Sequence, residues 1–156
     1  QESAFMEDAR SSAGALGLMQ LMPQTAQQVA RRHQLPAPRD SGLLDPEVNI
    51  RLGSRFLAQL LNSFDDQRVL ATAAYNAGPR RIRQWLPNED MPTDLWVEGI
   101  PFTETRDYVR RVLTYNIIYR DRLSERPLRL RDLMDKIRGK AVTTTAESGS
   151  EPSGEG

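Results

Sequence analysis

A single carboxyl group and a single amide are the first side chains of this sequence that could do chemistry together. Glu2 lies near the N-terminus, and its carboxyl group could give or take a proton. Gln20 is the only polar side chain in the apolar run 14–23, which glycines interrupt. An amide in an apolar wall suits a neutral ligand rich in hydroxyl and amide groups. Taken alone, Glu2 fits a solvated charge better than a catalyst, and Gln20 fits the solvent-facing residue of a core helix.

An aromatic ring and a second amide stand side by side further along the chain, at Tyr75 and Asn76, just before Gly78. A ring face can pack on the C–H groups of a sugar while an amide binds its hydroxyls. The same residues also fit the ordinary end of a helix, with Gly78 as its cap. The chemistry that they suggest is carbohydrate binding.

Composition excludes several other kinds of site. The chain has no cysteine, which excludes disulfides, thiolate nucleophiles and cysteine metal sites. His33 is the only histidine, so a histidine-rich catalytic metal centre is not expected. The 21 Lys and Arg residues balance 21 Asp and Glu residues, which disfavours a strongly basic nucleic-acid surface. No run approaches the ~20 apolar residues that a membrane-spanning helix needs.

The elements that must position these residues are helices. Apolar residues recur at helical spacing along most of the chain, and prolines mark several helix starts. No alternating run of five residues is bounded by turn residues, so strand should be minor. Residues 87–102 hold three prolines and fit a loop with at most one turn. Five or more helices are expected, and those that we can place cover about residues 23–32, 45–61, 69–78, 80–86 and 103–123.

Four segments, in this order and with these gaps, resemble the catalytic domain of soluble, Slt-type lytic transglycosylases, which are relatives of goose-type lysozyme. They are Glu2-Ser3-Ala4-Phe5, Gly17-Leu18-Met19-Gln20, Ala74-Tyr75-Asn76-Ala77-Gly78 and the segment 100–109. The resemblance covers roughly residues 1–125, and four ordered motifs make a specific match. It implies a mainly α, lysozyme-like fold with little or no β structure.

The resemblance also implies a role for each matching residue. Glu2 matches the catalytic acid/base. The implied substrate is peptidoglycan, cleaved at the β-1,4 bond between N-acetylmuramic acid and N-acetylglucosamine without water, to give 1,6-anhydromuramyl products. No cofactor and no metal are implied. The residues that match the substrate-binding groove are Ser11, Gln20, Met22, Tyr75, Asn76 and Glu104.

One carboxyl group would perform both proton transfers of that reaction. Ordinary glycosidases use two carboxyl groups. Here Glu2 would protonate the glycosidic oxygen, and the acetamido oxygen of the substrate would stabilise the cation. Glu2 would then take the proton from the muramyl 6-hydroxyl as it closes onto C1. Glu2 must begin protonated, so we expect an apolar surround, with Phe5, Leu18, Met19 and Met22 as candidates.

The expected organisation is a catalytic domain at residues 1–138 and a disordered tail at 139–156. Only Gln1 precedes Glu2, so we expect a fragment whose first helix is truncated at its N-terminus. The tail is rich in Ser, Thr, Gly and Glu and too poor in apolar residues to fold. The implied partners are peptidoglycan strands, with no nucleic acid and no transmembrane segment. We expect a monomer, located by its substrate in the periplasm or outer envelope.

Three alternatives remain open on the residues. A hydrolytic lysozyme would use water in place of the 6-hydroxyl, with Asp8, Asp45 or Glu104 assisting. A DNA-binding helix-turn-helix could run from Val69 through Gly78 to Trp85, although Pro79 and the zero net charge oppose it. A glycan-binding module without activity is the third alternative, and Glu2 argues against it.

Overall fold

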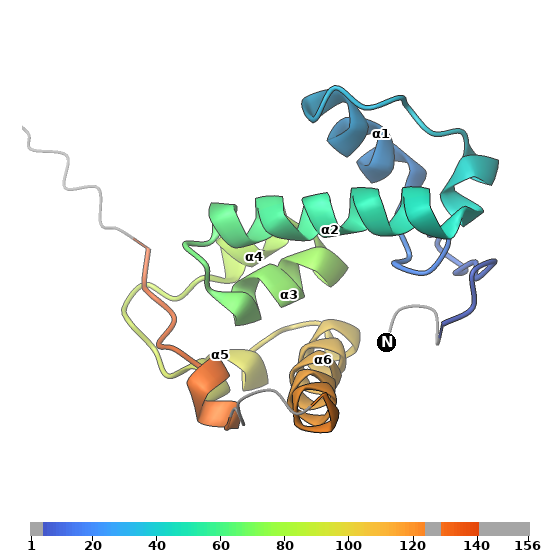
Figure 1. Ribbon diagram of the computed structural model, residues 1–156. Coiled ribbons are helices and arrows are strands. Elements are labelled where there is room, and N and C mark those ends of the chain that lie inside the picture. The colour runs from blue at the N-terminus through green and yellow to red at the C-terminus, as the bar shows by residue number, and fades with distance from the viewer. Residues whose placement is uncertain (1–4, 124–128, 141–156) are drawn as a thin grey trace, which may run out of the picture.

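The computed structural model describes residues 5–123 and 129–140. This part of the chain is helical, and its only β pairings are isolated bridges (Figure 1). The predicted mainly α fold class is therefore confirmed. Six α-helices and two short 3₁₀-helices occur in the described residues: α1 (Pro23–Arg32), η1 (Asp40–Leu44), α2 (Pro46–Ser63), α3 (Arg68–Ala77), α4 (Pro79–Trp85), α5 (Thr93–Glu98), α6 (Thr103–Arg122) and η2 (Leu130–Leu133).

The helix boundaries follow from local sequence signals. The Asp45 carboxylate accepts a hydrogen bond from the backbone N–H of Val48 at 3.0 Å, and Pro46 occupies the first turn of α2. Gly78 adopts a φ of 90°, which ends α3, and Pro79 starts α4 at the next residue. All five placed helices are present, with ends close to those predicted.

Two segments differ from expectation. Within residues 87–102 the chain forms α5, a six-residue helix, where we expected a loop with at most one turn. A helix this short depends on tertiary packing, and Trp96 is buried and donates a hydrogen bond from Nε1 to the carbonyl oxygen of Trp85 at 3.0 Å. The run 14–21 is a folded loop rather than the core helix that we considered for it.

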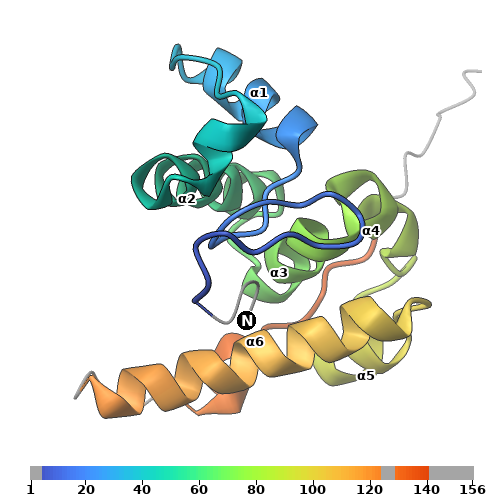
Figure 2. The same ribbon diagram turned by 90° about the vertical axis from the view of Figure 1, so that its right-hand side faces the viewer.

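Helix α3 lies at the centre of the domain. It packs against α2, α4 and α6, and the views from two sides place it between α2 and α6 (Figures 1 and 2). Ala71, Ala73 and Ala74 are fully buried, and their small side chains let the neighbouring helices approach closely. Ile82 of α4 is also fully buried in this core. A second, smaller core joins α1, α2 and the loop residues Leu16 and Leu21.

The segment 129–140 closes the domain at its C-terminal end. Met91 and Ile137 exchange two backbone hydrogen bonds of 2.9 Å, and Ile137 is buried. Gly139 donates its N–H to Asp90 Oδ1 at 3.0 Å, and Lys140 donates its N–H to the carbonyl oxygen of Pro87 at 2.8 Å. Backbone contacts thus continue two residues past the predicted domain end at 138, while 141–156 lie outside the described residues.

Among the residues that the structure describes, no helix is long and apolar enough to cross a bilayer.

Candidate functional site

A groove of about 350 Å³ brings together six residues that the sequence analysis singled out. They come from the loop before α1, from the last turns of α3 and from the first turns of α6, three elements that Figure 2 shows from one side. Glu2 lies outside the described residues, so its place in this groove stays a prediction. The lining residues are Ser11, Ala13, Ala15, Gln20, Met22, Tyr75, Asn76, Glu104, Tyr108 and Arg111.

The loop that forms one wall of the groove is held by its own polar groups. Ser11 Oγ accepts a hydrogen bond from the N–H of Ala15 at 2.9 Å, which closes a tight turn at Gly14. Leu16 and Leu21 exchange two backbone hydrogen bonds of 3.0 Å. The hydrogen bond of Ser11 therefore shapes the turn that places Ala13 and Ala15 in the groove wall.

Gln20 is also tied to this loop. Its Nε2 donates to the carbonyl oxygens of Ala9 at 3.0 Å and Gly17 at 2.8 Å. Its backbone has a φ of 44°, in the left-handed region that a non-glycine residue seldom occupies. Within the described chain no group hydrogen bonds its Oε1. The amide nitrogen thus fixes the side chain, and the amide oxygen is left as an acceptor at the groove.

A buried asparagine of α2, which the sequence analysis missed, anchors the loop to the helical core. Asn49 is fully buried, and its Nδ2 donates to the carbonyl oxygens of Leu16 at 2.9 Å and Leu43 at 2.7 Å. Its Oδ1 accepts from the N–H of Met19 at 2.7 Å. Gly17 lies against this amide, and a Cβ there would overlap it. The sequence pattern that could have identified Asn49 is an uncharged polar residue on the apolar face of α2, three residues before Leu52.

Tyr75 connects the loop to α3. Its hydroxyl donates to the carbonyl oxygen of Met19 at 2.9 Å, and its ring packs at a tilt against Phe56 with 5.3 Å between centroids. The ring is half-buried and lines the groove. Held at its hydroxyl and along its side, Tyr75 presents a fixed aromatic surface to a ligand.

Asn76 and Glu104 meet at the opposite wall, where α3 ends and α6 begins. The buried Thr105 donates its hydroxyl to Asn76 Oδ1 at 2.6 Å, and this bond turns the amide nitrogen of Asn76 toward Glu104. Asn76 Nδ2 then donates to Glu104 Oε1 at 3.4 Å. The Glu104 side chain is exposed at the groove. One carboxylate is thereby positioned by neutral hydrogen-bonding groups.

Two further groove residues were missed by the sequence analysis. Tyr108 and Arg111 follow Glu104 on α6 at spacings of four and seven residues, so the three share one face of the helix. Tyr108 belongs to the segment 100–109 that carried the family resemblance, and the helical spacing from Glu104 was the signal that could have found both.

The apolar surround expected around Glu2 stays a prediction because Glu2 lies outside the described residues, but the positions of its candidate members can be reported. Met22 lines the groove, but Phe5 is 77% exposed and is not among the lining residues. In the described part of the chain, the apolar side of the groove comes from Met22 with Ala13 and Ala15. No group of three or more His, Asp or Glu side chains that could hold a metal occurs in the described residues.

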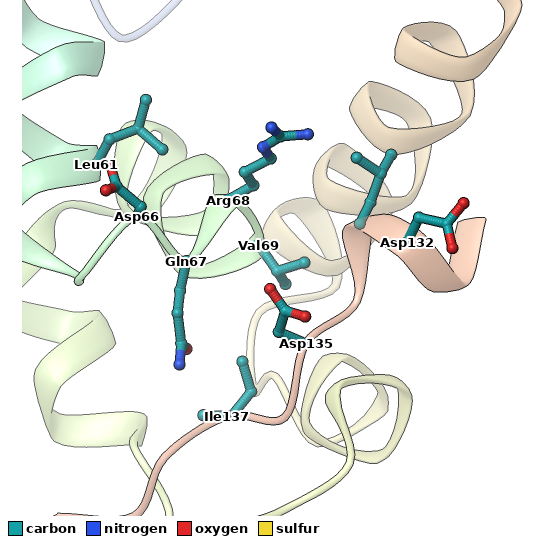
Figure 3. Close-up of a pocket in the computed structure, with 9 residues that line it drawn as sticks. Leu61, Asp66, Gln67, Arg68, Val69, Asp132, Asp135 and Ile137 are labelled. Atoms are coloured by element: carbon teal, nitrogen blue, oxygen red, sulfur yellow. The ribbon is translucent and has the colours of Figure 1, made fainter. Parts of the chain in front are cut away.

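A larger pocket of about 430 Å³ lies elsewhere and shares no lining residue with the groove (Figure 3). It lies between the start of α3 and the segment 132–137, where Gln67 Nε2 donates to the carbonyl oxygen of Lys136 at 3.2 Å. It is the seam along which the C-terminal segment packs. The smaller groove is the better candidate site because the residues with carbohydrate-binding chemistry converge there.

Comparison with known families identifies relatives of this domain. Residues 1–94 match the transglycosylase SLT domain, and residues 99–128 match the soluble lytic transglycosylase helical domain. The soluble lytic murein transglycosylase of Escherichia coli K12 is 44% identical over 130 residues, which are 81% of this chain and 20% of that protein. The Salmonella typhimurium protein of the same name is 43% identical over 135 residues, 85% of this chain and 21% of that protein.

Solved structures show the same relationship. The lytic transglycosylase Slt of Pseudomonas aeruginosa superposes with a TM-score of 0.78 at 49% identity, over 86% of this chain and 21% of that one. The 70 kDa soluble lytic transglycosylase of Escherichia coli gives a TM-score of 0.77 at 40% identity, over 86% of this chain and 22% of that one. The chain thus spans about a fifth of the length of each of these four relatives.

Proposed function

The chain belongs to the transglycosylase SLT domain family, and from this premise we propose that it cleaves the glycan strands of peptidoglycan as a lytic transglycosylase. The observation that carries the proposal is the convergence of Gln20, Tyr75, Asn76 and Glu104 on one groove. The fold is shared with lytic transglycosylases, and the soluble lytic murein transglycosylases among the relatives are named for this activity.

Glu2 is the proposed acid/base of the reaction. Its carboxyl group protonates the glycosidic oxygen between N-acetylmuramic acid and N-acetylglucosamine, and that bond breaks. The acetamido oxygen of the muramyl unit stabilises the cation at C1. The ionised Glu2 then takes the proton of the muramyl 6-hydroxyl as its oxygen bonds to C1, which yields the 1,6-anhydro product and returns the carboxyl group to its starting state.

The groove residues are proposed to hold the glycan. The Tyr75 ring offers a surface for the C–H face of a sugar unit, and its orientation is already fixed by Met19 and Phe56. Gln20 Oε1 and the Glu104 carboxylate can accept hydrogen bonds from sugar hydroxyl or acetamido N–H groups. Ser11 shapes the loop, while Met22 and Asn76 complete the walls. Because these side chains are held before a ligand binds, little ordering cost remains for binding.

Hydrolysis of the same bond is a second candidate reaction. Glu104 supplies the observation in its favour, since its exposed carboxylate lies in the groove, held by Asn76, and could orient a water molecule.

The helix-turn-helix alternative is not supported by the family matches, which place residues 1–94 in the SLT domain family. We propose that the partner of the protein is peptidoglycan. Because this substrate lies in the periplasm or outer envelope, we propose the same location for the enzyme. We also propose that it acts as a monomer.

Product analysis tests the proposed reaction. Purified peptidoglycan sacculi are digested with the intact protein, and the soluble muropeptides are separated and weighed by mass spectrometry. We expect 1,6-anhydromuramyl ends, which are lighter by one water than reducing muramyl ends. Reducing ends as the main product would show that water is the nucleophile and would replace the transglycosylase proposal with the lysozyme alternative. Release of no fragment at all would contradict both.

A further inference from the structure

Two consecutive arginines of α6 have different surroundings. Arg110 forms an ion pair with Glu98 of α5 and a second one, at 3.5 Å, with Asp107. Its hydrogen bond to Glu98 raises the pKa of the Arg110 guanidinium. Arg111 lines the groove instead, and in the described part of the chain no carboxylate lies within ion-pair distance of it. One arginine is thus neutralised locally, whereas the charge of the other is directed to the groove.

The Arg111 side chain is anchored close to its own backbone. Its Nε donates to the carbonyl oxygen of Asp107, one helical turn earlier, at 3.2 Å. This bond restricts the long side chain and reduces the entropy that binding would otherwise cost. Within the described residues the two terminal nitrogens, Nη1 and Nη2, have no hydrogen-bond partner. A guanidinium held in this way can donate two parallel hydrogen bonds to one carboxylate.

The charges of the groove are separated along α6. Among its described lining residues, Glu104 is the only acid and Arg111 the only base. Seven residues, or roughly two turns, separate them, so their backbone positions lie about 10 Å apart along the helix axis. The neutral hydrogen-bonding groups of Asn76 lie at the Glu104 end. A ligand that follows the groove therefore meets the Glu104 carboxylate and the Asn76 amide at one end and, at the other, a cation with no acidic partner among the described residues.

We propose that Arg111 is a carboxylate-binding subsite of the groove, which selects muramyl glycan over glycan that carries no acid. N-acetylglucosamine has no carboxyl group. N-acetylmuramic acid carries a lactyl group whose carboxylate is free in bare glycan, and in native peptidoglycan the attached peptide stem supplies carboxylates instead. Both sources present the same planar anion to the guanidinium. The proposal rests on the proposed function, because it specifies which substrate groups the same groove recognises.

Binding to three defined glycans tests this subsite. The intact protein carrying Glu2→Gln, which prevents turnover, is titrated by calorimetry with a tetramer of N-acetylglucosamine, with muramyl glycan stripped of its stems, and with muramyl glycan bearing stems. We expect an added Arg111→Gln to weaken binding of carboxylate-bearing glycan about five-fold, as for a partly exposed charge pair. Binding of the uncharged tetramer should not change. Weaker binding of the stripped glycan would identify the lactyl carboxylate as the group that Arg111 binds. Weaker binding of the stem-bearing glycan would identify a carboxylate of the peptide stem.

The neighbouring arginine provides the matched control. Arg110→Gln removes the same charge from the next residue of the same helix, yet its side chain pairs with Glu98 rather than lining the groove. It should leave all three affinities unchanged. Arg111→Lys should recover only part of the lost affinity, because an ammonium keeps the charge without the paired donors. The difference in affinity for carboxylate-bearing glycan between the parent protein and the Arg111→Gln variant should also shrink as salt is added, since salt screens an exposed charge pair.

Several outcomes would overturn the subsite, and they are distinguishable from failure of the proposed function. Unchanged affinity for both muramyl glycans in Arg111→Gln, or an equal loss for all three glycans, contradicts a carboxylate subsite while leaving the proposed reaction intact. An effect of Arg110→Gln as large as that of Arg111→Gln would show a general charge effect and also contradicts it. Binding of no glycan by the parent Glu2→Gln protein overturns the subsite and the proposed function together.

Discussion

The Tyr75 hydroxyl donates a 2.9 Å hydrogen bond to the carbonyl oxygen of Met19, and this bond joins the central helix to the groove loop. The two residues are 56 positions apart in the chain. Asn49 holds the same loop from the other side, through the N–H of Met19. The peptide groups flanking Met19 are therefore fixed by two helices at once, which anchors the groove loop to the helical core.

Replacing Tyr75 by phenylalanine should loosen this wall while the ring contact with Phe56 remains. The change leaves the Met19 carbonyl without the Tyr75 donor, so we expect the free energy of unfolding to fall by about 1–2 kcal/mol. Urea denaturation followed by circular dichroism measures it. Tyr119→Phe is the control, because Tyr119 is an exposed residue of α6 and its hydroxyl should contribute little. Equal effects of the two changes would show that the Met19 contact does not stabilise the domain.

Asn49→Ala should be more destabilising. It removes three hydrogen bonds, to Leu16, Met19 and Leu43, and leaves two buried carbonyl oxygens and one part-buried N–H without that partner. We expect the free energy of unfolding to fall by about 3–4 kcal/mol. Asn62→Ala, an exposed position of the same helix, should change it by less than about 0.5 kcal/mol. A small loss for Asn49→Ala in the same denaturation experiment would mean that the loop is held by its apolar contacts instead.

Local signals were sufficient for the five helices that we placed, but not for α5. Asp45 and Pro46 specify the start of α2, and the pair Gly78 and Pro79 separates α3 from α4, because each acts within one turn of its own position. The apolar run 14–21 misleads by the same reasoning. Its composition suits a helix, but its glycines adopt positive φ and its backbone is paired within the loop and with Asn49, a contact to a distant residue.

The candidate site shows the same difference between what local sequence signals predict and what contacts between distant residues decide. Six groove residues could be named because ordered motifs resembled a family, and not because their spacing implied proximity. Arg111 lies outside those motifs, and its pattern is that of a surface residue. Only the packing of α3 against α6 brings it to the groove while Arg110 contacts Glu98. Contacts between helices far apart in the sequence decide which of two adjacent arginines faces a ligand.

The C-terminal segment should be a stabilising part of the domain. Ile137 is 1% exposed and pairs with Met91 through two backbone hydrogen bonds. Ile137→Ala should lower the free energy of unfolding by about 2–4 kcal/mol, through lost burial and the cavity that it leaves. Leu130→Ala, in the same segment but 46% exposed, should cost much less. A loss for Ile137→Ala as small as that for Leu130→Ala, in thermal or urea denaturation, would indicate that the segment packs without contributing to stability.

Glu2→Gln should abolish cleavage while glycan binding survives. The amide keeps the shape of the carboxyl group but cannot give or take the proton, and both halves of the proposed reaction depend on it. General acid/base catalysis contributes about 10²–10⁴-fold, so the loss in kcat should reach or exceed the upper figure. Turnover of sacculi measures the rate, and glycan titration measures the binding. Glu7→Gln, an exposed acid nearby in the sequence, is the control. Residual activity within ten-fold of the parent would remove Glu2 from the proposed role.

Glu104→Gln should separate the two candidate reactions. If Glu104 only contacts the glycan, its amide still accepts hydrogen bonds, so affinity should fall a few-fold and kcat by less than about ten-fold. If Glu104 orients a water molecule as a base, kcat should fall by about 10²–10⁴-fold with little change in affinity. The contact with Asn76 survives in either case, because an amide oxygen also accepts a hydrogen bond from Nδ2. We therefore expect the mild loss together with unchanged 1,6-anhydro products. A large fall in kcat, accompanied by reducing ends from the parent enzyme, would assign Glu104 to the activation of water and establish hydrolysis as the reaction.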